Sequence, residues 1–304
     1  MKKPTVTIGI SAYNEQANIG QLLHRVLQEK PEQVRLEKVI VISDGSTDET
    51  AAKVKDYAQS IVRFIDQKKR LGLHQNQNRI VRMADSDILI ILDADVLPNK
   101  GFIDALCRPI LESPQVGIVG ARTKPAVPRN ALERVIVHGR ELKTSIYERI
   151  NGGDTIYLCH GRARAFAKRL YKRIVWPVDC PEDSYSYLFC LEKGFSFVYE
   201  PKADVTFRVP SSFREYAEKH VRFLTGKNQL SKYFEKSTIR DKYRIPLGVL
   251  SEKLLESFLR QPFATASYLG VMLISRLIWA RGSSYEPLWE VSETSKKILD
   301  SSSV

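Results

Sequence analysis

The chain has 304 residues, of which 43% are hydrophobic and 27% are charged, with 16 Gly and 14 Pro. This composition excludes collagen-like, low-complexity and wholly disordered proteins, and the length suits one large domain or two small ones. The 47 Lys and Arg exceed the 35 Asp and Glu by +12, so we expect an anionic partner: nucleic acid, a lipid headgroup surface or a phosphorylated substrate.

The cysteines and the N-terminus favour the cytoplasm. Four cysteines form neither a CxxC pair nor a dense framework, which favours reduced thiols over disulfides or zinc ligands. The first residues lack the long apolar segment of a secretory signal. We therefore expect the catalytic part of the chain to stay in the cytoplasm.

Strands and helices alternate in the first third of the chain. Apolar patterning predicts strands at 6–10, 39–43, 61–65 and 88–92, and helices at 15–28, 48–57 and 74–83. This alternation predicts an α/β fold with a mostly parallel sheet covered by helices on both faces. Ligands of such sheets bind beyond the carboxyl ends of the strands.

The second half of the catalytic region is expected to be α+β and built onto the same sheet. The pattern is basic and helical over 122–149, and it is extended over 155–165, 195–200 and 204–209. A helix is predicted at 184–193, directly after Pro181, Glu182 and Asp183.

The C-terminal part changes character beyond Tyr243. Residues 246–260 form an amphipathic pattern, and 263–280 are eighteen residues whose charge is limited to Arg276. A basic cluster precedes them, made of Lys232, Lys236, Arg240, Lys242 and Arg244. Three placements stay open for 263–280: on a membrane surface, across a membrane, or packed as a helical cap, with Arg276 disfavouring a crossing.

Acidic and polar residues follow three of the predicted strands. Asp93 and Asp95 flank Ala94 after a buried strand, where they could bind Mg²⁺ or Mn²⁺ or simply be solvated acids of a turn. Asp44 lies between a strand and a helix cap, so its carboxylate could accept hydrogen bonds from a nucleobase or ribose. Asn14 and Glu15 could bind a ligand or only begin a helix.

Together these segments resemble a known family. The series Ser11-Ala12-Tyr13-Asn14-Glu15, Ser43-Asp44-Gly45-Ser46-Thr47-Asp48, Asp93-Ala94-Asp95 and Glu182-Asp183 is similar to glycosyltransferase family 2, the inverting nucleotide-sugar enzymes of the GT-A fold. The resemblance covers residues 4 to about 230. It implies a GT-A catalytic domain at 1–230, with a nucleotide-binding half at 1–122 and an acceptor half at 123–230. A helical, membrane-associating region is expected at 231–304.

The resemblance also implies roles for single residues. The expected donor site contains Ala12, Asn14, Glu15, Asp44, Arg70, Asp93 and Asp95. Asn14, Glu15 and Asp44 would surround the base and ribose, Arg70 the phosphates, and Asp93 and Asp95 the ribose and the metal–diphosphate. Asp183 would be the catalytic base, which removes the acceptor proton during an inverting displacement.

Four further residues are expected at the acceptor or diphosphate: Gly161, Glu182, Lys219 and Arg222. Gly161 would make room for the donor sugar, and Glu182 would position acceptor or donor. Lys219 and Arg222, three apart on one helix face, resemble the QxxRW segment of processive synthases, with Lys219 and Phe223 replacing Gln and Trp. A solvated basic helix face is the alternative.

The sequence thus predicts a metal-dependent inverting glycosyltransferase for cell-envelope or polysaccharide synthesis. It would move a sugar from a nucleotide diphosphate to a hydroxyl or lipid-phosphate acceptor, at the cytoplasmic face of a membrane. A nucleotidyltransferase of similar fold is an alternative, but attack on phosphorus does not require an acceptor base at Asp183. A nucleic-acid-binding or other anion-binding protein is the second alternative. The basic residues are not interleaved with aromatic ones in a recognisable binding module, so no nucleic acid is expected.

Overall fold

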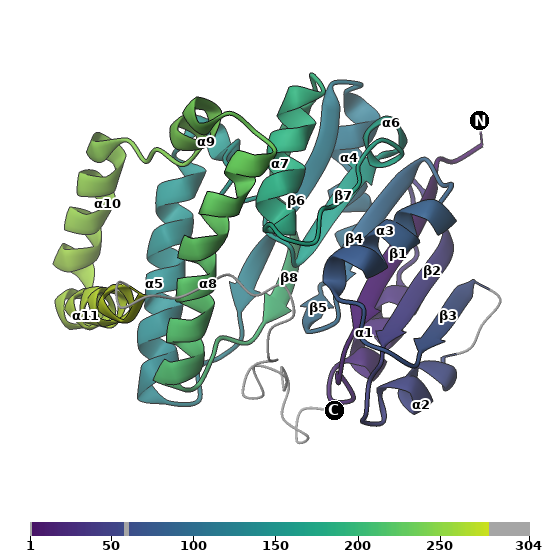
Figure 1. Ribbon diagram of the computed structural model, residues 1–304, viewed down its shortest axis with the longest axis horizontal. Coiled ribbons are helices and arrows are strands. Elements are labelled where there is room, and N and C mark those ends of the chain that lie inside the picture. The colour runs from purple at the N-terminus through teal and green to yellow at the C-terminus, as the bar shows by residue number, and fades with distance from the viewer. Residues whose placement is uncertain (1, 58–60, 280–304) are drawn as a thin grey trace.

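The computed structural model describes residues 2–57 and 61–279. An eight-stranded sheet forms the centre of the described part (Figure 1). The strands are β1 (Thr5–Ala12), β2 (Arg35–Asp44), β3 (Val62–Gln67), β4 (Ile88–Asp93), β5 (Val96–Pro98), β6 (Val116–Pro125), β7 (Ala163–Ala167) and β8 (Ser196–Phe207).

Helices cover the sheet and extend beyond it. They are α1 (Ile19–Gln28), α2 (Thr50–Lys55), α3 (Leu73–Met83), α4 (Phe102–Glu112), α5 (Ala131–Glu148), α6 (Lys168–Tyr171), α7 (Glu182–Glu192), α8 (Phe213–Gln229), α9 (Lys236–Lys242), α10 (Leu247–Arg260) and α11 (Pro262–Trp279). Two short 3₁₀ helices, η1 (Asn151–Gly153) and η2 (Leu230–Lys232), complete the described elements.

The strand order is β3-β2-β1-β4-β7-β6-β8-β5. The β1 strand pairs in parallel with β2 and β4, and β6 pairs in parallel with β8. The β7 strand is antiparallel to both of its neighbours, β4 and β6. The predicted α/β fold with a mostly parallel sheet is therefore confirmed.

Each central strand buries both of its faces, because alternate side chains enter different cores. In β4, Ile88, Ile90 and Leu92 join the core under α1 and α4, whereas Leu89 and Ile91 join the core under α3 and α7. This two-sided burial accounts for the continuous apolar run in the sequence of β4.

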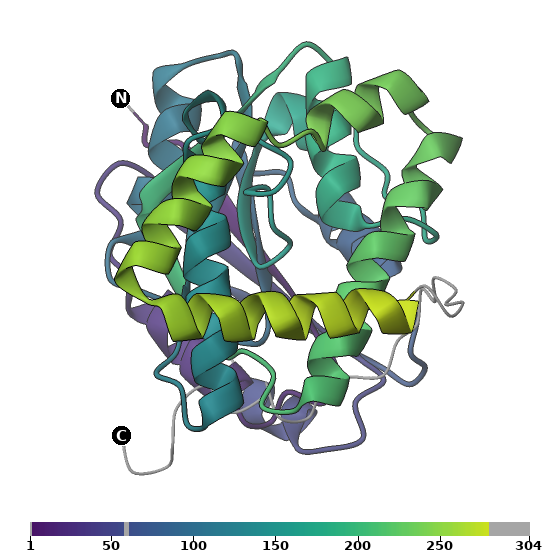
Figure 2. The ribbon, with the colours of Figure 1, turned by 90° about the vertical axis from the view of Figure 1, so that its left-hand side faces the viewer.

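A group of helices lies beside the sheet rather than on it. Figure 2 shows α11 crossing α5 and α8, and Tyr268 of α11 is buried with Leu142 and Ile146 of α5. Apolar residues of α10, including Leu250 and Leu254, pack against the same cluster. The helices α10 and α11 are therefore attached to the sheet domain through α5.

Several predicted boundaries were wrong. The α1 helix begins at Ile19, because Glu15 to Asn18 form a turn in which the Ile19 N–H donates to the Glu15 carbonyl at 2.9 Å. The α2 helix begins at Thr50 rather than at residue 48, since the Asp48 carboxylate accepts the Thr50 N–H at 3.0 Å. The expected helix at 184–193 instead begins at Glu182.

Larger differences occur between β6 and β8. The β6 strand was not predicted, and the expected division at 122/123 falls inside it. Extended structure over 155–165 was wrong: β7 begins at Ala163, and turns precede it after Gly152 and Gly153, both with positive φ. The two segments expected at 195–200 and 204–209 form one strand, β8, whose register against β6 shifts after Ala121.

None of the helices in the described ranges is long and apolar enough to span a bilayer. The predicted segment 263–280 corresponds to α11, except that Ala280 lies outside the described residues, as does the rest of the expected C-terminal region to 304. All four cysteines are buried free thiols.

The contact between α5 and α11 depends on Gly139, because a Cβ there would overlap the ring of buried Tyr268. We expect Gly139→Ala to lower the free energy of unfolding by about 1–3 kcal/mol, the usual range for overpacking. Urea unfolding measures this loss. Gly270→Ala on α11 is the matched control: nothing lies within 4 Å of its Cβ, so it should stabilise the helix by up to about 1 kcal/mol. Equal effects of the two variants would contradict the packing role of Gly139.

Candidate active site

The polar segments that follow β1, β2 and β4 meet at one edge of the sheet. Ala12, buried at the end of β1, pairs with Ser43 of β2, and Ser11 pairs with Asp93 of β4. Since all three strands run in the same direction, their carboxyl ends lie side by side. The structure therefore brings the expected donor-binding segments together.

Asn14 connects two of these segments. Its side-chain oxygen accepts the Thr47 N–H at 2.8 Å, and its own N–H donates to Ser46 Oγ at 3.1 Å. Its φ of 53° is in the left-handed region, which Asn adopts more readily than most residues. Asn14 thus fixes the loop after β1 against the loop after β2.

Glu15 is buried at the start of the turn before α1. Its N–H donates to Thr50 Oγ1 at 2.7 Å, and its carboxylate accepts from Asn18 Nδ2 at 3.0 Å. These contacts hold α1 and α2 together. A contact of Asn14 or Glu15 with base and ribose stays a prediction.

The buried carboxylate of Asp44 holds the loop that precedes α3. It accepts the N–H groups of Leu71 at 2.7 Å and Gly72 at 2.9 Å, and also Gln67 Nε2 at 3.1 Å. In the same loop, the Arg70 guanidinium lies 4.0 Å from the centroid of the Tyr13 ring. Asp44 thus positions the loop that carries Arg70, and its expected contact with a nucleotide stays a prediction.

Asp93 and Asp95 lie at the end of β4, next to other acids. Burial raises the pKa of Asp93 to about 7, and Asp95 and Glu182 add to the increase, while Arg162 and Arg164 oppose it. The Asp93 N–H donates to the Arg162 carbonyl at 2.9 Å, which fixes the start of β7 beside these acids. The two predicted metal-binding residues therefore share one site with Glu182.

Glu182 is held by an arginine that the sequence analysis missed. Arg164 of β7 is fully buried, and its guanidinium lies 3.2 Å from Glu182 Oε1 and 3.0 Å from Ser186 Oγ. Trp176 Nε1 donates to the same hydroxyl at 2.8 Å. A Cβ at Gly161 would overlap Glu182 Oε1, so Gly161 makes room for Glu182. Its expected role beside the donor sugar stays a prediction.

Asp183 follows Glu182 in the first turn of α7. Its Oδ1 accepts the N–H of Ser184 at 2.6 Å and the Ser184 hydroxyl at 3.2 Å. Burial raises the pKa of Asp183 to about 6 and Glu182 adds to this, whereas Arg164 and the contacts with Ser184 oppose it. A carboxyl group with this pKa can take up a proton near neutral pH.

Helix α8 presents Lys219 to the acids. Burial lowers the pKa of Lys219 to about 8; Asp95 opposes this shift, and Arg162 and Arg222 add to it. The predicted basic face of α8 therefore lies within electrostatic range of Asp95. The roles of Lys219 and Arg222 at a diphosphate stay predictions.

The sequence analysis did not predict that Arg162 and Arg164 belong to the site. Both lie just after Cys159-His160-Gly161, in a segment that was expected to be an ordinary strand. The one available signal was that every second residue of this segment is a charged Arg between small residues. His160 is buried near Thr123, and its pKa is well below its usual value because of burial and three nearby arginines. His74 lies 2.7 Å from the Cys180 carbonyl, a packing contact.

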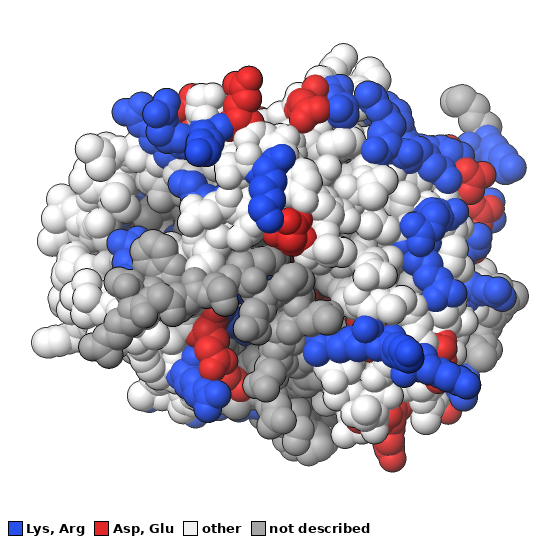
Figure 3. Space-filling model, viewed as in Figure 1, with Lys and Arg blue, Asp and Glu red and all other residues white. Residues whose placement is uncertain are grey.

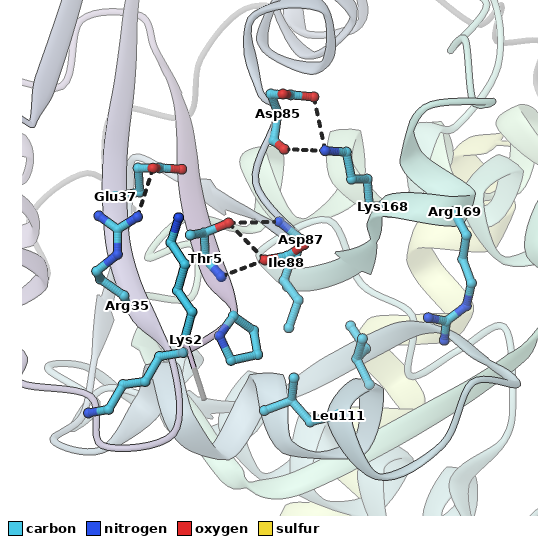
Figure 4. Close-up of a pocket in the computed structure, with 13 residues that line it drawn as sticks. Lys2, Thr5, Arg35, Glu37, Asp85, Asp87, Ile88, Leu111, Lys168 and Arg169 are labelled. Atoms are coloured by element: carbon cyan, nitrogen blue, oxygen red, sulfur yellow. Dashed lines mark hydrogen bonds and ion pairs between the residues drawn. The ribbon is translucent and has the colours of Figure 1, made fainter.

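A surface cavity lies at the opposite, amino end of the strands. It has a volume of about 940 Å³ and is lined by Lys2, Thr5, Arg35, Lys168 and Arg169, among others (Figure 4). Two acidic residues that line the cavity have partners in it: Asp85 lies 3.0 Å from Lys168, and Asp87 accepts the Thr5 N–H at 2.8 Å. This cavity is therefore separate from the acids at the carboxyl ends.

Residues 7–175, more than half of the chain, match the family described as Glycosyl transferase family 2. The chain belongs to this family. Its curated relatives include the poly-β-1,6-N-acetyl-D-glucosamine synthase of Staphylococcus aureus, 24% identical over 262 residues that cover 84% of this chain. A 4,4'-diaponeurosporenoate glycosyltransferase of the same species is 39% identical over 104 residues, 33% of this chain and 27% of that protein. The chain spans 62% of the length of the synthase.

Solved glycosyltransferases of the GT-A fold share this architecture. The mannosyltransferase PcManGT of Pyrobaculum calidifontis, in complex with GDP-Man and Mn²⁺, has a TM-score of 0.58 and 21% identity, over 94% of this chain and 78% of that one. TarS of S. aureus, in complex with UDP-GlcNAc, has a TM-score of 0.54 and 18% identity, over 85% of this chain and 73% of that one.

The carboxylates at the end of β4 could supply some, but not all, of the ligands of a magnesium or manganese ion. Within residues 2–57 and 61–279, no group of three or more His, Cys, Asp or Glu side chains is arranged to hold a metal. Asp93 and Asp95 supply carboxylate oxygens, the ligands that Mg²⁺ and Mn²⁺ prefer, and such ions often complete their shell with substrate phosphates. The mutual repulsion that raises the Asp93 pKa is also relieved by a cation.

Asp93 should make the stability of the metal-free protein depend on pH. Because its folded-state pKa is raised, its stabilising contribution is complete at low pH and disappears as the pH rises through about 7. We expect Asp93→Asn to gain about 2 kcal/mol relative to wild type between pH 5 and pH 8, since one pKa unit is about 1.36 kcal/mol. Urea unfolding with chelator at both pH values measures this.

Asp56→Asn, at the exposed end of α2, is the matched control for that comparison. A constant difference between Asp93→Asn and wild type at pH 5 and pH 8 would contradict the raised pKa of Asp93.

Proposed function

We propose that this family 2 member is a metal-dependent, inverting glycosyltransferase that uses a nucleotide diphosphate sugar. The observation that carries the proposal is the position of Asp183, a buried carboxyl with a pKa of about 6 that shares Glu182 and Arg164 as neighbours with Asp93. A metal-dependent inverting transfer needs a group that accepts the proton of the acceptor hydroxyl. It also needs acids that bind the metal, and here the two lie close together.

The donor class is supported by what the similar proteins bind. PcManGT was solved with GDP-Man and TarS with UDP-GlcNAc, and both ligands are nucleotide diphosphate sugars. The carboxyl ends of β1, β2 and β4 supply the expected place for such a donor. We propose the nucleotide diphosphate as the shared part and leave the sugar open.

The proposed reaction uses the residues as follows. Asp183 takes the proton of the acceptor hydroxyl as its oxygen attacks C1 of the sugar. The new bond between C1 and the acceptor oxygen forms while the bond between C1 and the diphosphate oxygen breaks, and the diphosphate leaves with the electron pair. The configuration at C1 inverts because attack and departure occur on opposite faces.

The leaving diphosphate gains negative charge during this step. Lys219, with a pKa of about 8, lies near Asp95, and Arg222 of the same helix lies near Lys219; both can offset that charge. A divalent cation, when held by Asp93, Asp95 and the diphosphate, neutralises part of the same charge. Arg164 holds Glu182 in place at the start of α7.

Asp183→Asn should reduce transfer by at least 10³-fold, because the amide cannot accept the proton, while it leaves donor binding within about twofold. The wild-type rate should rise with pH up to about 6 and then level off. Product formation from UDP-GlcNAc and GDP-Man with an acceptor panel measures the rate, and thermal shift with Mn²⁺ measures donor binding.

Asp95→Ala is the contrasting variant, since it should weaken both metal-dependent donor binding and transfer. Normal turnover by Asp183→Asn would reject Asp183 as the base. Donor binding that is insensitive to chelator would reject the metal requirement.

We also propose that the helices after α8 lie on the cytoplasmic surface of a membrane. Three large apolar side chains of α10 and α11 are exposed to solvent: Leu247 by 81%, Leu259 by 77% and Phe263 by 88%. Exposed apolar area of this kind indicates an interaction surface. The exposed basic residues Lys236 and Arg240 of α9 lie close by along the chain, and Figure 3 shows Lys and Arg side chains gathered over α9. Apolar residues flanked by cations suit an anionic lipid surface.

Phe263→Glu should therefore reduce co-sedimentation with vesicles of phosphatidylglycerol and phosphatidylcholine at least fivefold, because the new charge cannot enter the lipid interface. Val175→Glu, at an exposed apolar residue outside α10 and α11, is the matched control and should bind as wild type does. Equal vesicle binding by both variants would reject the membrane contact through α11.

A further inference from the structure

Three basic residues form what we call the inner basic cluster: Arg140 and Lys143 of α5, and Arg162, which directly precedes β7. The guanidinium carbons of Arg162 and Arg140 lie 3.9 and 5.6 Å from the centroid of the same ring, Phe207. Lys143 Nζ lies 5.6 Å from the ring of Tyr268. The three cations are thus held by aromatic faces on β8 and α11.

No carboxylate in the described ranges forms an ion pair with any residue of the inner basic cluster. Arg140 instead donates to Thr123 Oγ1 at 3.3 Å, and Arg162 Nε is buried without a hydrogen-bond partner. Structural arginines elsewhere in this fold do have acids: Arg164 lies 3.2 Å from Glu182, and Arg208 lies 3.2 Å from Glu133. The cations of the inner basic cluster lack such an acid within the described ranges.

The charged forms of the residues in the cluster are disfavoured by burial and by their mutual repulsion. Burial lowers the pKa of Arg140 to about 10, and Arg162 adds to the decrease. Burial likewise lowers the pKa of Lys143 to about 8, with Arg140 and Arg276 contributing. Partly buried cations without counter-charge are unfavourable, so their retention points to an anion that is bound during function.

The cluster extends from the donor acids toward the C-terminal helices. At its inner end, the Arg162 carbonyl accepts the Asp93 N–H at 2.9 Å. At its outer end, Lys143 faces Tyr268 of α11, the helix that crosses α5 and α8 in Figure 2. An anion here would lie beside the expected donor site, with access toward the exposed apolar residues of α11.

We infer that the inner basic cluster binds a phosphate group of the acceptor, so that the acceptor is a phosphorylated molecule. This inference rests on the proposed function, because it gives that reaction its acceptor class. A phosphate monoester carries a charge of about −1.5 to −2 and three acceptor oxygens, which match two guanidinium groups and one ammonium. The phosphate could belong to a lipid or to a soluble ester.

The first test is calorimetric titration of the whole chain, saturated with UDP and Mn²⁺, with decyl phosphate below its micelle concentration. Decyl maltoside is the uncharged control probe. We expect decyl phosphate to bind and decyl maltoside not to bind, and Arg140→Gln and Lys143→Gln each to weaken binding at least 10-fold. Arg134→Gln, exposed on the same helix α5, is the matched control and should bind as wild type does.

Inorganic phosphate, as a second probe, distinguishes the two sources. Decyl phosphate binding at least 10-fold more tightly than inorganic phosphate would assign a lipid phosphate, and equal affinities would assign a soluble ester. Unchanged binding by Arg140→Gln, or loss of binding once UDP and Mn²⁺ are added, would overturn the inference, since the cations would then not hold a separate phosphate.

The same titrations separate this inference from the proposed function. UDP binding without any binding of decyl phosphate or inorganic phosphate would reject the phosphate site alone. Phosphate binding without any nucleotide binding would reject the proposed function and the assignment of the phosphate to an acceptor, while the phosphate site itself would stand.

Thermal stability gives a readout that a purely structural role would not produce. Arg140→Gln removes an unpaired buried charge, so its unfolding temperature without ligand should equal or exceed that of wild type. Phosphate should raise the unfolding temperature of wild type, because it binds the folded state, and raise that of Arg140→Gln much less. A destabilised Arg140→Gln whose response to phosphate is unchanged would show that Arg140 only supports the fold.

Discussion

The buried pair of Arg164 and Glu182 connects the two halves of this protein. Arg164 belongs to β7, the strand that joins the parallel β1–β4 half to β6 and β8, and Glu182 begins α7 on the sheet face. Breaking a buried pair leaves an uncompensated charge, which usually costs about 3–5 kcal/mol. Because Ser186 and Trp176 complete the network, the start of α7, and with it Asp183, is fixed relative to the end of β4.

Charges of opposite sign are segregated around this pair. Asp93, Asp95, Glu182 and Asp183 gather at the end of β4 and the start of α7, and burial together with mutual repulsion raises the pKa of Asp93 and Asp183. Lys143 of α5 and Lys219 of α8 belong to a second group, in which burial and neighbouring cations lower the pKa of both lysines. The group of acids and the group of cations each place like charges close together, which is unfavourable in the folded protein. A ligand that brings both a cation and phosphates would relieve both groups at once.

The first half of the fold was predictable because each strand carries a strong local signal. The run Ile88 to Leu92 is short enough for a strand buried on both faces, and the place of the acids after it follows from the direction of a parallel sheet. The β6 strand was missed because Gly117 and Gly120 weaken its pattern. Both glycines are required by packing, since a Cβ at 117 would lie 2.7 Å from Phe195 Cβ and one at 120 would lie 2.8 Å from the Leu158 carbonyl. In the sequence, Ile156 and Leu158 resemble residues of a strand. In the structure they belong to a turn, and their side chains are buried.

The site residues divide in the same way. Residue types at strand ends gave the acids, whereas the roles of Asp44 and Gly161 depend on partners far along the chain, Leu71 and Glu182, which no local pattern reveals. The contacts of Asp44 and Asn14 have a further effect, because they tie the loops after β1 and β2 to the loop that carries Arg70. These three segments lose their conformational freedom when the chain folds, not when a ligand arrives. Their surface is therefore preorganised, and a ligand seated on it gains affinity without an ordering penalty.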